Sequence, residues 1–120
     1  EPLSKAYAIP KDDPNREAVM EKCLQDAAAT PMEILRLSCE AIDLHREMLD
    51  KGSVIMLSDV GTGVIFCQSA LYGAANVRVN TKSMADRAFA QAMDEEVDAL
   101  VEKYGTIARQ VYDAVMGRFV

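Results

Sequence analysis

The segment from Ser58 to about Asn80 constrains the fold more than any other part of the chain. It contains no Lys, Glu or Pro, and its only charged residues are Asp59 and Arg78. A helix that is apolar on most sides is expected to be buried on most sides. Each helical glycine costs about 1 kcal/mol relative to alanine, so tight packing or a ligand is expected to offset that cost. The small residues of the segment are Gly61, Gly63, Ser69, Ala70, Gly73, Ala74 and Ala75.

The chain before this segment is predicted to hold a lead-in and two helices. Residues 1–14 carry three of the four prolines and are predicted to be extended. Asp13 and Pro14 fit the N-cap and the first position of a helix. Because a proline disfavours helical backbone in the residue before it, a break or sharp kink is predicted at Thr30-Pro31. An amphipathic helix follows over 32–51, and Gly52 is suited to its C-terminal end.

The last segment, residues 85–119, keeps an apolar stripe at helical spacing and predicts one long helix. About 33 residues would make that helix near 50 Å long, and Gly105 is a candidate position for a bend or split. No strand-like alternation of useful length occurs in the sequence. The predicted fold is therefore all-α: an antiparallel helical bundle with a long C-terminal helix and a buried Gly/Ala-rich central helix.

One side of the predicted central helix carries a stripe that is mostly polar. At 100° per residue, eight positions fall within an arc of roughly 100°. Buried polar groups need partners, so this stripe is expected to meet water, a neighbouring helix or a ligand. If it lines a cleft, Asp59 and the two asparagines are its polar anchors. The eight positions are Ser58, Asp59, Thr62, Phe66, Ser69, Gly73, Asn76 and Asn80.

Several of these residues also fit a purely structural role. Ser58 is an ordinary N-cap residue, and Asp59 in a first turn suits the helix dipole. Arg78 lies on another face, where it is either a salt-bridge partner or an anchor for an anionic ligand. His45 shares a face with apolar residues, which favours a hydrogen-bonded core or interface histidine.

Composition excludes several other classes of function. The net charge is −6 and no basic run occurs, which argues against a nucleic-acid partner. The apolar stretches are interrupted by charged residues and are predicted not to span a membrane. No secretory leader pattern opens the chain, so a cytoplasmic location is expected. Cys23, Cys39 and Cys67 form no metal-binding spacing and are predicted to be reduced, with no metal site.

Two stretches of the chain resemble the formiminotetrahydrofolate cyclodeaminase/methenyltetrahydrofolate cyclohydrolase family. Residues 58–61, Ser-Asp-Val-Gly, match the family's Ser-Asp-x-Gly helix start. Residues 73–80, Gly-Ala-Ala-Asn-Val-Arg-Val-Asn, are similar to its Gly-Ala-x-x-Asn-Val-x-Ile-Asn run, with one residue fewer before Asn76 and with Val79 in place of the usual Ile. Residues 6–11, Ala-Tyr-Ala-Ile-Pro-Lys, look like the family's lead-in. The loop at 53–56 is more apolar than the family's Asn-Pro-Asn-like loop.

The resemblance implies chemistry on the one-carbon unit that bridges N5 and N10 of tetrahydrofolate. A cyclodeaminase closes the ring of the 5-formimino form and expels ammonia, and a cyclohydrolase adds water to the methenyl bridge. Both reactions need proton transfer, which a placed carboxylate can provide. The implied roles are proton transfer or pterin binding for Asp59, further folate contacts from Ser58, orientation of the ligand by Asn76 and Asn80, and contact of Arg78 or Lys82 with the anionic glutamate tail.

The resemblance also implies how the chain is organised. The family's N-terminal Pro-Gly-Gly-Gly-Ser motif does not occur here, so residues 1–120 are expected to be the C-terminal part of a single helical domain. No cofactor beyond the folate substrate is implied, and a homodimer is expected. The alternative from another class is a helical assembly module, whose polar stripe is satisfied by a partner helix and which binds no folate.

Overall fold

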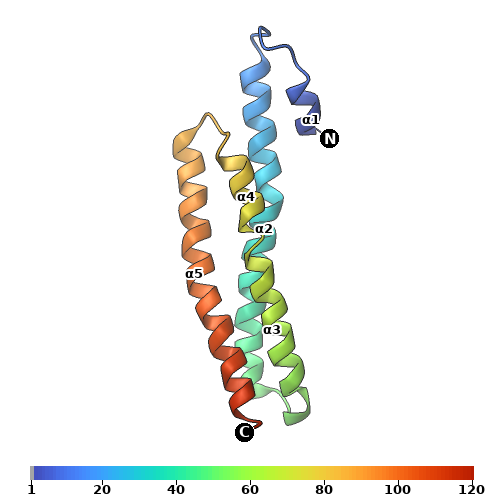
Figure 1. Cartoon of the computed structure of the whole chain (residues 1–120), viewed down its shortest axis with the longest axis vertical. Coiled ribbons are helices and arrows are strands. Elements are labelled where there is room, and N and C mark those ends of the chain that lie inside the picture. Colours follow the sequence, from blue (N-terminus) through green and yellow to red (C-terminus); the bar gives the residue numbers. More distant parts are fainter. Residues whose placement is uncertain (1) are drawn as a thin grey trace.

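The computed structural model describes residues 2–120, and all the regular secondary structure in that range is helical (Figure 1). The segment α3–α4 runs back along α2, and α5 returns in the direction of α2, which confirms the predicted antiparallel all-α bundle. The 31-residue α5 is the predicted long C-terminal helix, and it is continuous through Gly105. The elements are α1 (Pro2–Tyr7), α2 (Arg16–Lys51), the 3-10 helix η1 (Val54–Met56), α3 (Leu57–Leu71), α4 (Ala74–Thr81) and α5 (Arg87–Gly117).

The main hydrophobic core lies where α2, α3 and α5 meet. Leu35 and Ile42 of α2 are fully buried there, together with Val64 of α3. Gly61 of α3 faces Val115 of α5 so closely that a Cβ atom on the glycine would lie 3.0 Å from the valine Cγ1. Tight packing therefore accounts for Gly61, as the sequence predicted.

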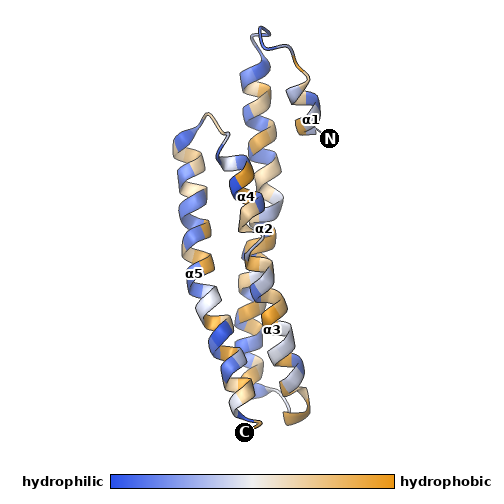
Figure 2. Cartoon of the chain, viewed as in Figure 1, coloured by the Kyte–Doolittle hydropathy of each residue, from blue (hydrophilic) through white to orange (hydrophobic). Residues whose placement is uncertain are grey.

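The central helix α3 is buried on one side only within this chain. Its buried positions point to α2 and α5, while hydrophobic side chains on the opposite side are exposed; Phe66 is 71% exposed. Figure 2 shows little hydrophilic colour along the α3 ribbon. The prediction of burial on most sides therefore does not hold for the single chain. The bundle measures 65 × 25 × 19 Å, and its radius of gyration of 18.9 Å exceeds the about 14 Å of a compact chain of this size.

The N-terminal boundaries differ from the prediction. Residues 2–7 form α1, which packs on α2, instead of an extended lead-in; Glu1 lies outside the described residues. The helix α2 begins at Arg16 with Asn15 as its N-cap residue, two positions later than predicted. The Asp13 carboxylate accepts a hydrogen bond from the Asn15 amide at 2.8 Å, so Asp13 shapes the preceding turn and is not the cap.

Two internal helix boundaries also differ from the prediction. No break occurs at Pro31, because α2 runs without interruption from Arg16 to Lys51 and buries Ala28, Met32 and Leu35 around the proline. The central segment, predicted to be one helix from 58 to 80, is instead divided at Tyr72–Gly73 into α3 and α4. The helix α4 packs on α2 and α5 and buries Val77, Asn80 and Thr81. Gly52 ends α2 as predicted, with its amide donating to the Met48 carbonyl.

The stretch Val54–Thr81 is long and apolar enough to cross a membrane by length and composition, and an 18-residue window within it has a mean hydropathy of 1.6. This differs from the prediction that no segment meets that criterion. As folded, the stretch is divided among η1, α3 and α4, and α3 has 15 residues, fewer than the about 20 that a spanning helix needs. Only 28% of the apolar window is buried within the chain, so most of this surface lacks an intramolecular cover.

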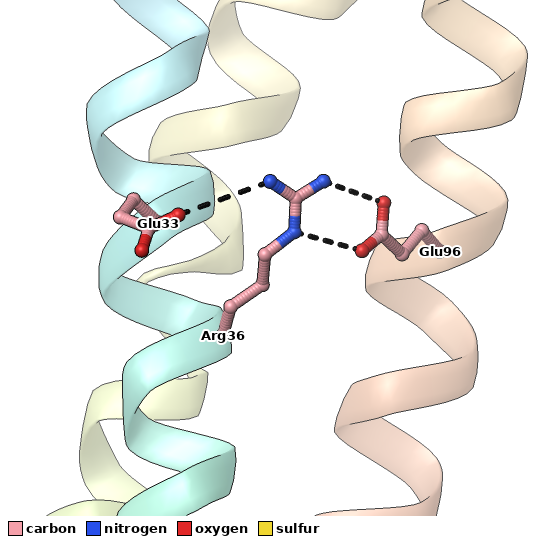
Figure 3. Close-up of polar contacts among 3 residues, drawn as sticks. All are labelled: Glu33, Arg36 and Glu96. Carbon is pink, nitrogen blue, oxygen red and sulfur yellow. Dashed lines mark hydrogen bonds and ion pairs between the residues drawn. The ribbon is translucent and has the colours of Figure 1, made fainter.

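Polar contacts join the long helices along their length. Figure 3 shows the Arg36 guanidinium of α2 in a two-point contact with Glu96 of α5, with both N···O distances at 2.9 Å. Glu33 contacts the same guanidinium at 3.9 Å. Further along, the Tyr104 hydroxyl of α5 donates to Asp43 of α2 at 2.8 Å. These contacts set the alignment of α5 on α2.

Near the N-terminal end of α2, Glu21 contacts the loop that precedes α5. Its carboxylate accepts hydrogen bonds from the Ala85 amide at 2.6 Å and the Asp86 amide at 3.2 Å. The Asp86 side chain in turn caps α5 by accepting from the Phe89 amide. The bond from Ala85 lowers the pKa of Glu21 below its ordinary value of 4.5.

Replacement of Leu35 by alanine tests the assignment of the core. Leu35 is 0% exposed, so Leu35→Ala is expected to lower the unfolding free energy by about 2–5 kcal/mol through lost burial and a residual cavity. Leu37→Ala on the same helix, where the side chain is 53% exposed, is the matched control and should cost much less at concentrations where the chain is monomeric. Urea unfolding measures both values, and equal losses would contradict the assignment.

The Glu21 contact predicts a pH-dependent contribution to stability. Because the folded state lowers the pKa of Glu21, its contribution is present above pH 4.5 and is lost as the pH falls below it. The urea midpoints of wild type and Glu21→Gln should therefore differ at pH 7 and converge towards pH 3. Glu40→Gln, an exposed carboxylate on the same helix, is the control. A constant wild-type-to-variant difference across this range would show that the Glu21 charge is irrelevant.

Candidate functional site

The polar stripe predicted on the central helix lies mainly on the outer side of the bundle. Six of its eight residues are exposed in the single chain, and Asn80 is buried. Asn76 lies 17 positions after Asp59, which corresponds to about 25 Å of helical rise. The stripe therefore does not line one cleft within this chain. The exposed members are Ser58, Asp59, Thr62, Phe66, Ser69 and Asn76.

Asp59 is the predicted site residue that lies at a cavity. It is in the first turn of α3, as expected, and Ser58 beside it is exposed; the N-cap is Met56 and not Ser58. The cavity lies between α2 and α3 and has a volume of about 190 Å³. Ligand pockets usually measure about 300–1,000 Å³, so this cavity holds only part of a folate-sized molecule. Its walls are Leu44, His45, Met48, Met56, Asp59 and Val60.

His45 lines the same cavity as Asp59 and was not predicted as a site residue. Its Nδ1 lies 2.6 Å from the Ala41 carbonyl oxygen, which can only accept, so Nδ1 carries the hydrogen. In the neutral ring, Nε2 is then the basic nitrogen. A Cβ atom at Gly63 would lie 2.4 Å from Nε2, so the absence of a side chain at Gly63 makes room for the imidazole. That helical glycine was the signal in the sequence that could have pointed to His45.

The other predicted binding residues have structural partners or lie elsewhere. Arg78 of α4 forms an ion pair with Asp98 of α5, which raises the pKa of Arg78 and favours the salt-bridge interpretation of this residue. The Asn80 side-chain amide donates to the Asn76 carbonyl at 3.0 Å. Lys82 is exposed at the C-terminal end of α4. None of these four residues lines any of the five principal cavities formed by residues 2–120.

The described residues provide no evident metal centre. Within the range 2–120, no group of three or more His, Cys, Asp or Glu side chains is placed to hold a metal ion. All three cysteines are free, as predicted. Burial raises the pKa of the Cys39 thiol to about 11, so this cysteine is an uncharged core group at neutral pH.

Comparison with known proteins identifies the family of this helical bundle. Residues 1–99 match the formiminotransferase-cyclodeaminase family, and this range includes the Asp59 cavity and all of α4. The chain belongs to that family, which confirms the resemblance seen in the motifs around Asp59 and Asn76.

Two relatives show how far the similarity extends. The chain is 32% identical over 118 residues to the methenyltetrahydrofolate cyclohydrolase of Methylorubrum extorquens, which covers 94% of this chain and 57% of the relative. It is 26% identical over 119 residues to the formimidoyltransferase-cyclodeaminase of Sus scrofa, which covers 95% of this chain and 22% of that protein. The chain thus spans little more than half the length of the bacterial relative.

Proposed function

We propose that this protein acts in one-carbon folate metabolism, converting 5,10-methenyltetrahydrofolate or 5-formiminotetrahydrofolate. The observation that carries the proposal is the 32% identity to a methenyltetrahydrofolate cyclohydrolase across 94% of the chain. The lower identity to the cyclodeaminase, 26%, favours hydrolysis of the methenyl bridge over ammonia release. The ligand is then a small anionic folate, and no metal, nucleotide cofactor or nucleic acid is required.

Hydrolysis of the methenyl bridge needs groups that move one proton at a time. The bridging carbon is cationic, and water adds to it with formation of a C–O bond and loss of one proton. The C–N5 bond then breaks, N5 gains a proton, the hydroxyl loses one, and the 10-formyl product forms. We propose that Asp59 stabilises the cation and takes part in proton transfer, with Ser58 beside it. The cavity beside α3 supports this role because Asp59 and His45, two residues able to transfer protons, are both among the residues that line it.

Substitution of Asp59 tests this proposal. In the purified protein of full natural length, Asp59→Asn keeps the side-chain size but removes the charge, and turnover of 5,10-methenyltetrahydrofolate should fall by about 100-fold or more. Loss of methenyl absorbance measures the reaction against an enzyme-free blank, and ammonia release from the 5-formimino substrate is assayed in parallel.

Asp26→Asn is the control, because Asp26 is an exposed carboxylate on α2 paired with Lys22. Wild-type turnover that persists in Asp59→Asn would remove Asp59 from the chemistry. A well-folded wild type that neither binds nor converts either folate would leave the assembly-module alternative.

We also propose that a second copy of the chain covers the exposed apolar side and gives a cytoplasmic homodimer. Apolar residues of α2 that the chain leaves exposed or half-buried recur at alternating spacings of three and four, which is the spacing of a seam between two packed helices. Phe66 of α3 extends this surface. The three unpaired cysteines support a reducing compartment. The seam residues of α2 are Ile34, Leu37, Ala41, Leu44 and Met48.

A charge placed in the seam is expected to separate the copies. Light scattering after size exclusion should give a dimer for the wild type and a monomer for Leu37→Asp, because a buried unpaired carboxylate is costly. Val79→Asp on α4 is the control, since Val79 and Leu37 are both 53% exposed in the single chain. A monomeric wild type that floats with lipid vesicles would instead show that a membrane covers this surface.

A further inference from the structure

A second cavity lies on the other side of α3, between α3 and α5. Its volume is about 470 Å³, within the range of small-molecule pockets. Three members of the predicted polar stripe line this cavity, and Asp59 lines the other one. Residues of the stripe therefore lie at cavities on two different flanks of α3. Its walls are Thr62, Ile65, Phe66, Ser69, Arg109 and Tyr112.

The chemistry of this cavity is that of a site for an aromatic acid. Phe66 and Tyr112 supply two aromatic rings from different helices, and aromatic rings pack well against a planar ligand. Thr62 and Ser69 supply hydroxyl groups on either side of Phe66. The Thr62 hydroxyl can donate or accept a hydrogen bond, while the Ser69 hydroxyl donates to the Ile65 carbonyl at 3.0 Å and can accept from a ligand. The lining therefore combines aromatic rings with polar groups that can orient a bound ligand.

Arg109 supplies the positive charge of the cavity. Its guanidinium lies over the Tyr112 ring, with Cζ 5.7 Å from the ring centroid. Its Nε contacts Asp113 at 3.1 Å. Among residues 2–120, no hydrogen bond joins the two terminal nitrogens of Arg109 to another residue. Those two nitrogens form the planar fork that binds a carboxylate at two points.

The position of this cavity relative to Asp59 suits a ligand that crosses the outer side of α3. Phe66 lies seven positions after Asp59, a rise of about 10 Å along the helix. Phe66 also lines a separate hollow between α2 and α3, beside Ile34 and Leu37 and distinct from the Asp59 cavity, so it borders cavities on both flanks of α3. Arg78 of α4, by contrast, forms an ion pair with Asp98 of α5 and lines neither cavity.

We propose that the α3–α5 cavity binds the benzoylglutamate part of a reduced folate, with Arg109 holding a carboxylate of the glutamate tail and Phe66 and Tyr112 flanking the benzoyl ring. This inference rests on the proposed folate function and assigns the tail to Arg109 instead of Arg78 or Lys82. In this arrangement the benzoylglutamate end of the ligand lies away from Asp59.

Direct binding and turnover together test the assignment in the full-length protein. Arg109→Gln should weaken binding of p-aminobenzoylglutamate, measured by calorimetry, about tenfold or more, because a two-point charged contact is lost. The KM for 5,10-methenyltetrahydrofolate should rise by a similar factor, while kcat changes little. The 5,10-methenyltetrahydropteroic acid amide, which lacks the glutamate and ends in an uncharged carboxamide, should show no change in KM. Arg109→Lys should recover part of the loss. Arg118→Gln, which removes an exposed arginine paired with Asp50, is the matched control.

The possible outcomes separate the inference from the function. Unchanged binding and KM in Arg109→Gln, with an active wild type, would overturn the tail assignment and leave the folate function standing. An equal KM rise for the tailless substrate would also overturn it, because it would show a structural role for Arg109. Binding of p-aminobenzoylglutamate that depends on Arg109, without any turnover, would support the cavity assignment and refute the catalytic proposal.

Discussion

Hydrophobic contact among α2, α3 and α5 is the interaction on which the rest of the structure depends. Leu35, Ile42 and Val64 are fully shielded at the centre of that contact. Gly61 lets α3 approach α5 at Val115, which sets the position of the Ser58–Asp59 end of α3 relative to both long helices. Without this packing, neither of the two cavities beside α3 would have walls, since each is formed by α3 and one long helix.

The same packing explains why one side of the bundle remains apolar and uncovered. The helix α2 carries two hydrophobic stripes, and the chain's own helices cover the one that includes Met32 and Leu35. The stripe that includes Leu37 and Leu44 stays exposed. An elongated bundle of three long segments has little interior, so a second layer of helices is the simplest means of burying this surface. The cavity at Asp59 opens on this side, and such a layer would therefore also close it.

Much of the fold was predictable because long amphipathic patterns dominate local preferences. The helices over residues 32–51 and 85–119, the end of α2 at Gly52 and the tight packing at Gly61 all followed from spacing and residue size. The break predicted at Pro31 was wrong: the proline removes one backbone donor, but buried neighbours on α2 keep the helix continuous. The division at Tyr72–Gly73 was missed because apolar composition alone does not show where the hydrogen-bond pattern of a helix is interrupted.

The site was less predictable than the fold. Asp59 was placed correctly in a first turn beside a cavity, and the family motif singled it out. Angular position on an ideal helix suggested that Asn76 and Asn80 share its cleft, but Asn76 lies about 25 Å further along the helical rise and Asn80 is buried. Helical geometry within one segment also says nothing about which residues on other helices face it, so His45 and Arg109 could not be found from the stripe alone.

The contact between Glu21 and the loop before α5 joins residues 64 positions apart in the sequence. The chain must form α2, turn, and return through α3 and α4 before this contact can close. Closing such a long loop has an entropic cost, and the helix packing that forms earlier offsets that cost. The start of α5 is therefore expected to be fixed late in folding and to exchange its backbone amide hydrogens sooner than the middle of the same helix.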